Sequence, residues 1–407
     1  MRMCFYGQAK TACAEPDHMK KKPVILTFVG NYLPGYKAGG ILRTLVNMVD
    51  HLCGEFDFKI VTKDHDLGEK HQYPNIKVDQ WQRVGNSEVK YLSTKSCSLT
   101  NLTGIITSTP HDVLFLNSFF DPFTVKVLLL RMFGRLQGKP IIVAPWGEFA
   151  WPSLRQKYLK KYIFMKTARL LRFYSDVVWR ASSEYEAADI VRVMNVNSKD
   201  IHIAGDFPIK NIPAASNDNP PACSLSCREG LRLVFLSRIS REKNLDYALK
   251  ILSKVKAKVS FDIYGPTENM SYWKECQALI GQLPKNVEVK YFGIVKPNEV
   301  VKTFGRYDLF LFPTGGEAYG HVIAEALTAG TPVLISTDTP WRNLKADGLG
   351  WDIDLGEPDG FVDVIESLAM LNDHELINMR AVVKSKVEYR LLDPATLHSN
   401  RQLFLRN

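Results

Sequence analysis

The chain has 407 residues, which exceeds one ordinary hydrophobic core and predicts two domains. Hydrophobic residues make up 45% of the sequence and charged residues 23%, as is typical of soluble globular proteins. The net charge is +9, and no apolar run approaches the roughly 20 residues that cross a bilayer, so a membrane-spanning class is excluded.

The positive charge is concentrated in the first half. Residues 1–210 hold 29 Lys and Arg against 19 Asp and Glu, and the remainder holds 23 against 24. A basic half suits nucleic acid, an anionic membrane surface or an acidic substrate. Seven dispersed cysteines without zinc or redox spacing, and a start without an apolar signal segment, predict a cytoplasmic protein with reduced thiols.

Short apolar runs alternate with amphipathic stretches over residues 21–208, after an expected flexible extension at 1–20. Helices are predicted at Ile41–Leu52 and Glu184–Met194, and this alternation is typical of a Rossmann-like, doubly wound parallel sheet. The predicted strands are Val24–Val29, Phe58–Val61, Val113–Leu116, Ile141–Ala144, Val177–Trp179 and Ile201–Ala204.

Residues 209–230 are rich in Pro, Ser and Asn, which indicates an interdomain linker. A second α/β series follows over residues 231–385, and ligands of such sheets bind at the carboxyl ends of the strands. Its predicted strands are Leu233–Leu236, Phe261–Tyr264, Val287–Tyr291, Leu309–Phe312 and Val333–Ile335.

The segment GGEAYGHVIAEALTAGTPVLIS, from Gly315 to Ser336, carries the strongest functional signal. A helix is predicted from about Gly320 to Ala329, with Gly330 as its C-cap. The free N–H groups at this helix start favour an anion such as phosphate, and glycine permits close approach of the ligand.

Two carboxylates, Glu317 in the loop and Glu325 in the helix, lie eight residues apart in this segment. The helix has no polar face, so a buried Glu325 requires a partner. That partner is either a ligand or a structural Arg or backbone amide, and the pattern leaves both open. Arg238 and Lys243, after the first strand of the second domain, either clamp a diphosphate or belong to a solvated charged loop.

Taken together, the ordered motifs of the second half resemble the retaining glycosyltransferases of family 4, which have the GT-B fold. The motifs are LVFLSRISREKN, FDIYGP, VEVKYFGIV, the DLFLFPTGGEAYGHVIAEALTAGTPVLIS block and TPW, spanning Leu233 to about Asp354. The resemblance implies an α/β GT-B fold, in which two Rossmann-like domains face each other across a cleft. It also implies that a tail at 386–407 packs back on the N-terminal domain.

The resemblance also assigns roles in binding a nucleotide-sugar donor. Glu325 would bind the ribose, Glu317 would face the donor sugar, and Arg238 and Lys243 would neutralise the diphosphate. We therefore expect Glu317, Arg238 and Lys243 to be catalytic. The remaining expected donor-binding residues are Tyr319, Gly320, His321, Ile294, Val295 and Gly265.

The first half resembles a subgroup that builds cell-surface polysaccharides, through YLPGYKAGG, DHDLG, NSFF and APWGEF. The resemblance places Gly39 and Gly40 at the cleft, near donor and acceptor, and Trp146 and Glu148 near the acceptor. Trp146 departs from the pattern, because relatives carry His or Arg at about this place. Glu148 is the nearest titratable group, and a loop carboxylate paired with Arg or Lys is its alternative interpretation.

A basic segment over residues 153–174 interleaves cations with aromatic and aliphatic residues and contains no acid. This pattern favours an anionic membrane surface over nucleic acid, for which no binding motif is present. An ordinary helix with a solvated basic face is the alternative. The expected membrane patch consists of Arg155, Lys157, Lys160, Lys161, Lys166, Arg169 and Arg172.

The expected reaction moves a sugar from a UDP- or GDP-sugar to a hydroxyl of a lipid-linked oligosaccharide acceptor, with retention of configuration. The expected setting is surface polysaccharide synthesis at the inner face of the cytoplasmic membrane. No cofactor or metal is expected, because no paired-carboxylate motif accompanies the loops. A sugar-nucleotide epimerase and a non-catalytic binding subunit of a membrane assembly complex remain as alternatives, whereas the missing GxGxxG disfavours a dehydrogenase.

Overall fold

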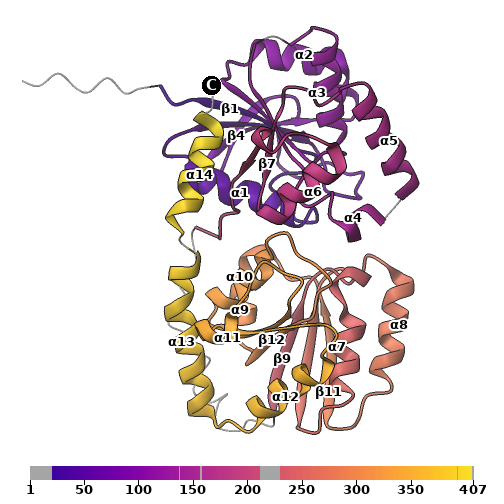
Figure 1. The fold of residues 1–407 in the computed structure, drawn as a ribbon, viewed down its shortest axis with the longest axis vertical. Helices are drawn as coiled ribbons and strands as arrows, with labels where there is room; N and C mark the ends of the chain where they lie inside the picture. The colour runs from indigo at the N-terminus through magenta and orange to yellow at the C-terminus, as the bar shows by residue number, and fades with distance from the viewer. Residues whose placement is uncertain (1–20, 137, 156–157, 211–229, 392, 406–407) are drawn as a thin grey trace, which may run out of the picture.

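The computed structural model describes residues 21–136, 138–155, 158–210, 230–391 and 393–405. The predicted extension at 1–20, most of the predicted linker (211–229) and Lys157 of the basic segment lie outside the described residues. Figure 1 shows two lobes, one above the other, with helices α13 and α14 running along the side of both.

The N-terminal domain is built on an eight-stranded sheet of order β3-β4-β2-β1-β5-β6-β7-β8 among the described residues. All neighbours pair in parallel except the antiparallel β3–β4 hairpin. The strands are β1 (Val24–Phe28), β2 (Asp57–Lys63), β3 (Trp81–Val84), β4 (Ser87–Leu92), β5 (Val113–Asn117), β6 (Ile141–Ala144), β7 (Val178–Ala181) and β8 (Ile201–Ile203).

Helices cover both faces of this sheet, so its central strands are buried on both sides. Leu26 and Phe28 belong to one core cluster, whereas Ile25 belongs to the other. The helices are α1 (Gly40–Leu52), α2 (Leu99–Ser108), α3 (Pro122–Met132), α4 (Trp151–Arg155), α5 (Tyr158–Leu170) and α6 (Glu184–Met194), with short 3₁₀ turns at Lys95–Cys97 and Ser198–Asp200.

The C-terminal domain is built on a six-stranded parallel sheet of order β11-β10-β9-β12-β13-β14. Its strands are β9 (Leu231–Leu236), β10 (Val259–Tyr264), β11 (Val287–Gly293), β12 (Leu309–Phe312), β13 (Val333–Ser336) and β14 (Gly350–Ile353). Its helices are α7 (Leu245–Leu252), α8 (Met270–Ile280), α9 (Val300–Phe304), α10 (His321–Thr328), α11 (Leu344–Asp347), α12 (Pro358–Ala369) and α13 (Asp373–Leu391), with 3₁₀ turns at Arg241–Lys243 and Pro297–Glu299.

The last helix, α14 (Pro394–Leu405), returns to the N-terminal domain. The Phe404 ring packs against Phe56 and Phe115 at centroid distances of 5.6 and 5.4 Å. The Asn400 side chain donates to the Gly205 carbonyl at 2.8 Å. The crossing thus begins at α14, whereas residues 386–391 of the predicted tail are the last turns of α13 in the C-terminal domain.

The predicted α/β fold with two doubly wound parallel sheets is confirmed. Three strands, β3, β4 and β14, were not predicted. β3 (WQRV) is a half-exposed edge strand without an apolar run, and β14 (GWDI) is only four residues long. Such short polar strands take their conformation from pairing with a neighbour rather than from their own pattern.

Candidate functional site

A cavity of about 940 Å³ lies between the two domains. Loops after β1, β6 and β7, together with Asp206, form its N-terminal wall. Loops after the first five strands of the second sheet form its C-terminal wall. Both sets lie at the carboxyl ends of parallel strands, where ligands of open α/β sheets bind. The volume is at the upper end of the roughly 300–1,000 Å³ of small-molecule sites.

On the C-terminal wall, helix α10 begins directly after Gly320, which has a φ of 82°. A Cβ atom at this position would lie 2.8 Å from Cδ1 of Ile323. Glycine therefore fits here because it adopts a positive φ without strain and has no side chain to clash with Ile323. The Trp341 indole donates to the Tyr319 carbonyl at 2.6 Å and anchors the turn. The first N–H groups of a helix lack intrahelical acceptors, so this helix start offers an anion site.

The three residues expected to be catalytic lie together on this wall. The Lys243 ammonium is 2.8 Å from a Glu317 oxygen, and both side chains are largely buried. Arg238 donates to Glu242 at 2.9 Å and to Glu268 at 3.1 Å. Burial lowers the pKa of Arg238, but these two carboxylates outweigh it and raise the pKa overall. The wall therefore holds two cations, each held in place by carboxylates of its own domain, on the same cavity as the start of α10.

The predicted ribose ligand Glu325 is buried on α10, and its charged neighbour comes from the other domain. Arg43 of α1 lies with its guanidinium 3.4 Å from a Glu325 oxygen. Burial raises the pKa of Glu325, and the positive charge of Arg43 opposes that rise. An ion pair thus joins the two walls at the position that we expect a ribose to occupy.

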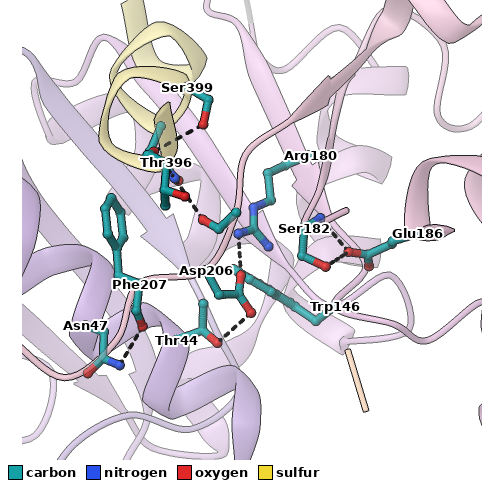
Figure 2. A network of polar contacts seen from close by, with 12 residues as sticks. Thr44, Asn47, Trp146, Arg180, Ser182, Glu186, Asp206, Phe207, Thr396 and Ser399 are labelled. Carbon is teal, nitrogen blue, oxygen red and sulfur yellow. Dashed lines mark hydrogen bonds and ion pairs between the residues drawn. The ribbon is translucent and has the colours of Figure 1, made fainter. Parts of the chain in front are cut away.

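A second contact across the cavity joins His321 to Thr44, whose side chains are 2.5 Å apart. Thr44 also lies 3.4 Å from Asp206, which forms a buried ion pair with Arg180 (Figure 2). Burial lowers the pKa of His321 to about 4, so its imidazole is neutral at pH 7. The start of α10 is therefore fixed from both domains.

Trp146 lines the cavity from the loop after β6. Its indole N–H donates to Oδ1 of Asn117 at 3.0 Å, and the Arg180 guanidinium lies 4.0 Å from the ring centroid. The next residue, Gly147, faces Ala318 of the C-terminal wall, because a Cβ added at 147 would lie 3.3 Å from the Ala318 Cβ. Trp146 thus lies where the two walls approach each other.

Glu148 was expected near the acceptor, but it is absent from the residues that line the cavity. Its carboxylate turns instead toward the loop after β5, where it accepts hydrogen bonds from the Ser118 hydroxyl and the Phe119 N–H, both at 2.6 Å. Burial raises the pKa of Glu148 to about 7, although these hydrogen bonds lower it. The structure therefore gives Glu148 a loop-bracing position. The positive charge of Lys161 also lowers the pKa of Glu148, in line with the alternative interpretation of a loop carboxylate beside a Lys.

The remaining predicted donor residues line the far part of the C-terminal wall. Ile294 and Val295 follow β11, and half of the Ile294 side chain is exposed. Gly265 follows β10 with a φ of 134°, and a Cβ there would lie 1.8 Å from the Ser237 carbonyl oxygen. An apolar surface beside two crowded backbone segments is suited to a planar base.

The predicted glycines Gly39 and Gly40 also line the cavity, at the start of α1. Asp66, which is buried, holds the loop before them by accepting hydrogen bonds from the N–H groups of Tyr36 at 2.9 Å and Lys37 at 3.2 Å. The DHDLG motif thus shapes the glycine-rich loop from a distant part of the sequence.

Several cavity-lining residues escaped prediction, namely Arg43, Thr44, Glu186 and Asp206. Glu186 accepts from the Gly147 N–H at 2.5 Å and from the Ser182 N–H at 2.7 Å. The pattern Ser183-x-x-Glu186 at a helix start was a detectable signal, because it resembles a capping box. Arg43 and Thr44 carry no local signal, since their partners lie more than 100 residues away, and Asp206 pairs with Arg180 from a separate strand 26 residues earlier.

The described residues of the expected membrane patch lie on α4, on α5 and, for Arg172, in the turn after α5. Helices α4 and α5 do not line the cavity apart from Ser153. Lys160, Lys166, Arg169 and Arg172 are exposed, as is Arg155. Lys161 differs, because its ammonium donates to the Ser153 carbonyl at 2.7 Å. Exposed apolar side chains lie among these cations: Trp151, Tyr158, Leu159, Tyr162, Ile163, Leu170 and Leu171.

Within the described part of the chain, no helix is both long and apolar enough to cross a membrane. The same residues contain no group of three or more His, Cys, Asp or Glu side chains that could hold a metal ion.

Comparisons with known proteins agree with this geometry. Residues 228–383 match the family model for glycosyl transferases group 1. An uncharacterized 41.2 kDa protein from the cps region of Klebsiella pneumoniae is 23% identical over 264 residues, which cover 63% of this chain and 69% of that protein. The chain spans less than half of the length of four further curated relatives that it matches.

Solved structures show the same fold over most of the chain. Anabaena Alr3699/HepE in complex with UDP and glucose superposes with a TM-score of 0.64 at 14% identity, covering 94% of this chain and 98% of that one. WaaG, a glycosyltransferase involved in lipopolysaccharide biosynthesis, superposes with a TM-score of 0.63 at 13% identity, covering 93% and 98%.

Proposed function

We propose that this chain, whose residues 228–383 match the family model for glycosyl transferases group 1, moves a sugar from a nucleotide-diphosphate sugar to a sugar hydroxyl with retention of configuration. The observation that carries the proposal is that the start of α10, Arg238 and Lys243 all line the same cavity on its C-terminal wall. A solved neighbour binds UDP-glucose, which supports a nucleotide-sugar donor, and we propose that this donor is a UDP- or GDP-sugar.

In the proposed reaction the bond between the anomeric carbon and the diphosphate breaks, and the acceptor oxygen bonds to the same face of that carbon. The departing phosphate takes the acceptor proton. Negative charge builds on the diphosphate, and Arg238, Lys243 and the first N–H groups of α10 stabilise it electrostatically. These fixed charges supply the stabilisation, so we propose transfer without a metal or other cofactor.

The remaining donor contacts follow the same arrangement. Glu317, held by Lys243, faces the donor sugar, and Glu325 binds the ribose after its ion pair with Arg43 opens. The base lies against Ile294 and Val295. Closure of the two domains over the donor excludes water and limits hydrolysis.

The acceptor is proposed to be a lipid-linked oligosaccharide in surface polysaccharide synthesis. One relative is a protein of a cps region, and one structural neighbour acts in lipopolysaccharide biosynthesis. The exposed cations and apolar side chains of α4 and α5 would hold the enzyme on the anionic inner face of the cytoplasmic membrane.

The donor proposal is tested by thermal shift with a panel of UDP- and GDP-sugars, followed by turnover of the donor that binds. A bound donor stabilises the folded state by mass action. Turnover that requires an acceptor separates a transferase from an epimerase. If Glu317→Ala leaves turnover unchanged, the catalytic assignment is wrong, and binding without any turnover supports the non-catalytic alternative.

The membrane proposal is tested by flotation with liposomes that contain anionic lipid. We expect replacement of Arg155, Lys160, Lys166, Arg169 and Arg172 by Gln to abolish flotation. The matched control replaces five exposed lysines of the C-terminal domain, which should still float: Lys254, Lys256, Lys274, Lys285 and Lys302. Equal flotation of both variants would contradict the membrane patch.

A further inference from the structure

The Trp146 indole is held so that only part of its ring reaches the cavity. Its N–H is used by Asn117, its edge lies against Phe115 at a centroid distance of 6.4 Å, and Arg180 covers one face. Arg180 has no exposed surface and does not line the cavity, so it covers the inner side of the ring. The ring surface that remains for a ligand is therefore apolar and faces outward.

The backbone at Trp146 is strained in a way that places this ring. Its φ is 55°, a left-handed conformation that a bulky side chain rarely adopts. Strain of this kind persists where the surrounding structure fixes it, most often at functional sites. Here the Asn117 hydrogen bond and the Arg180 stack fix the ring, and its orientation toward the cavity is the result.

Two carboxylates flank this apolar surface on the same wall (Figure 2). Glu186 accepts three hydrogen bonds, from the Gly147 N–H and from the N–H and hydroxyl of Ser182. Asp206 accepts from Arg180 and from Thr44. A carboxylate has about four lone-pair sites, so each retains capacity for a hydroxyl donor.

The carboxylates of this wall disfavour anionic ligands. Asp189 also lines it, which makes three carboxylates. Asp206 is paired with Arg180 and Asp189 with Arg192, whereas the hydrogen-bond donors to Glu186 are all neutral, so Glu186 carries the uncompensated negative charge. The two cations of the N-terminal domain that line the cavity are both paired, Lys37 with Glu69 and Arg43 with Glu325. A phosphate or carboxylate on the ligand would meet like charge in a partly desolvated site, where repulsion is strong.

We infer that Trp146 is the stacking platform of the acceptor subsite, and that the acceptor sugar it takes is a neutral pyranose. The C–H face of the ring lies on the indole, and Glu186 and Asp206 accept hydrogen bonds from its hydroxyls. The inference rests on the proposed function, because it assigns the N-terminal wall to the acceptor and the C-terminal wall to the donor.

The test uses saturation-transfer NMR on the full chain, with methyl β-D-glucopyranoside, methyl α-D-mannopyranoside and glucose 6-phosphate as probes. We expect transfer to at least one methyl glycoside, strongest at the protons of one ring face, and none to glucose 6-phosphate. Trp146→Ala should remove the signal, whereas Trp146→Phe should retain part of it, because the aromatic platform remains.

The matched control is Trp81→Ala, since Trp81 lies on the sheet edge beside Lys59 and Lys90 and outside the cavity. This variant should keep the full signal. The inference is overturned if Trp146→Ala keeps the signal, if glucose 6-phosphate binds as well as the neutral sugars, or if no methyl glycoside binds.

Thermal shift with nucleoside diphosphates on the same samples distinguishes failure of this inference from failure of the proposed function. If the wild-type protein binds nucleotide but no sugar, this inference alone is rejected. If the wild-type protein binds neither nucleotide nor sugar, the proposed function is rejected as well. Retained nucleotide binding by Trp146→Ala shows that the variant is folded. Where that variant unfolds, partial retention by Trp146→Phe supports the platform and complete loss in folded Trp146→Phe overturns it.

Discussion

The two walls of the cavity are built in different ways. On the C-terminal wall Lys243 and Glu317 pair with each other and lie in loops that directly follow strands. The N-terminal wall instead rests on Arg180 and Asp206, a pair buried in the domain core. This difference teaches that the wall proposed to bind the donor is organised by loops at strand ends, whereas the wall proposed to bind the acceptor depends on the packing of a whole domain.

Breaking the buried pair should therefore have the largest effect on stability. We expect Arg180→Met to lower the free energy of unfolding by about 3–5 kcal/mol, because it leaves Asp206 as an uncompensated buried charge. The measurement is urea unfolding at pH 7. The control, Arg241→Met in the C-terminal domain, breaks an exposed pair with Glu275 and should leave the urea midpoint close to that of the wild type. Equal losses would remove the contrast between the walls.

Breaking the C-terminal wall should instead affect turnover. We expect Lys243→Met to lower donor turnover by about 10²–10³-fold, because one fixed charge at the leaving diphosphate is lost. Lys250→Met removes an exposed lysine of the following helix, paired with Asp246, and should change turnover less than about twofold. Steady-state rates with saturating donor decide the matter, and a loss below threefold in Lys243→Met would place the stabilising charge elsewhere.

The same difference explains what could be predicted from the sequence. The boundaries of the loop and helix between Gly315 and Ser336 are set by residues within that segment. Helix α10 therefore starts within one residue of its predicted position. Asp206 and Thr44 come together from positions 162 residues apart, so no spacing reveals them. The loop that holds Glu148 was predicted correctly, but the direction of the Glu148 side chain was not. That direction is set by the N–H groups of a different loop, which the local sequence does not reveal.

The contact between Arg43 and Glu325 offers a smaller effect that separates a ligand from a structural partner. If Glu325 binds the ribose, Glu325→Gln should weaken binding of the preferred nucleoside diphosphate by roughly 10–100-fold, since it loses charge-assisted hydrogen bonds. Arg43→Gln should weaken it less, because Arg43 only occupies the site before binding. Calorimetric titration of both variants measures this, and equal losses would favour a purely structural ion pair.

The smallest expected effect is the pH dependence of the contact between His321 and Thr44. Burial lowers the pKa of His321 to about 4, against about 6.5 in an unfolded chain. Between these values the unfolded state binds a proton that the folded state does not, so stability falls as the pH falls from 6.5 to 4. Above pH 6.5 the imidazole is neutral in both states, so this loss of folding stability is absent.

We expect wild-type stability, relative to His321→Gln, to decrease by on the order of 1 kcal/mol over that interval, once screening at a partly exposed site is allowed for. Urea unfolding at pH 7.5, 6.5, 5.5 and 4.5 measures the difference. His374→Gln, at an exposed position of α13, should remain parallel to the wild type throughout. If the free energy of unfolding of His321→Gln also changes with pH in parallel with the wild type, the imidazole does not hold α10 against the N-terminal wall. The two walls would then be coupled through Arg43 and Glu325 instead.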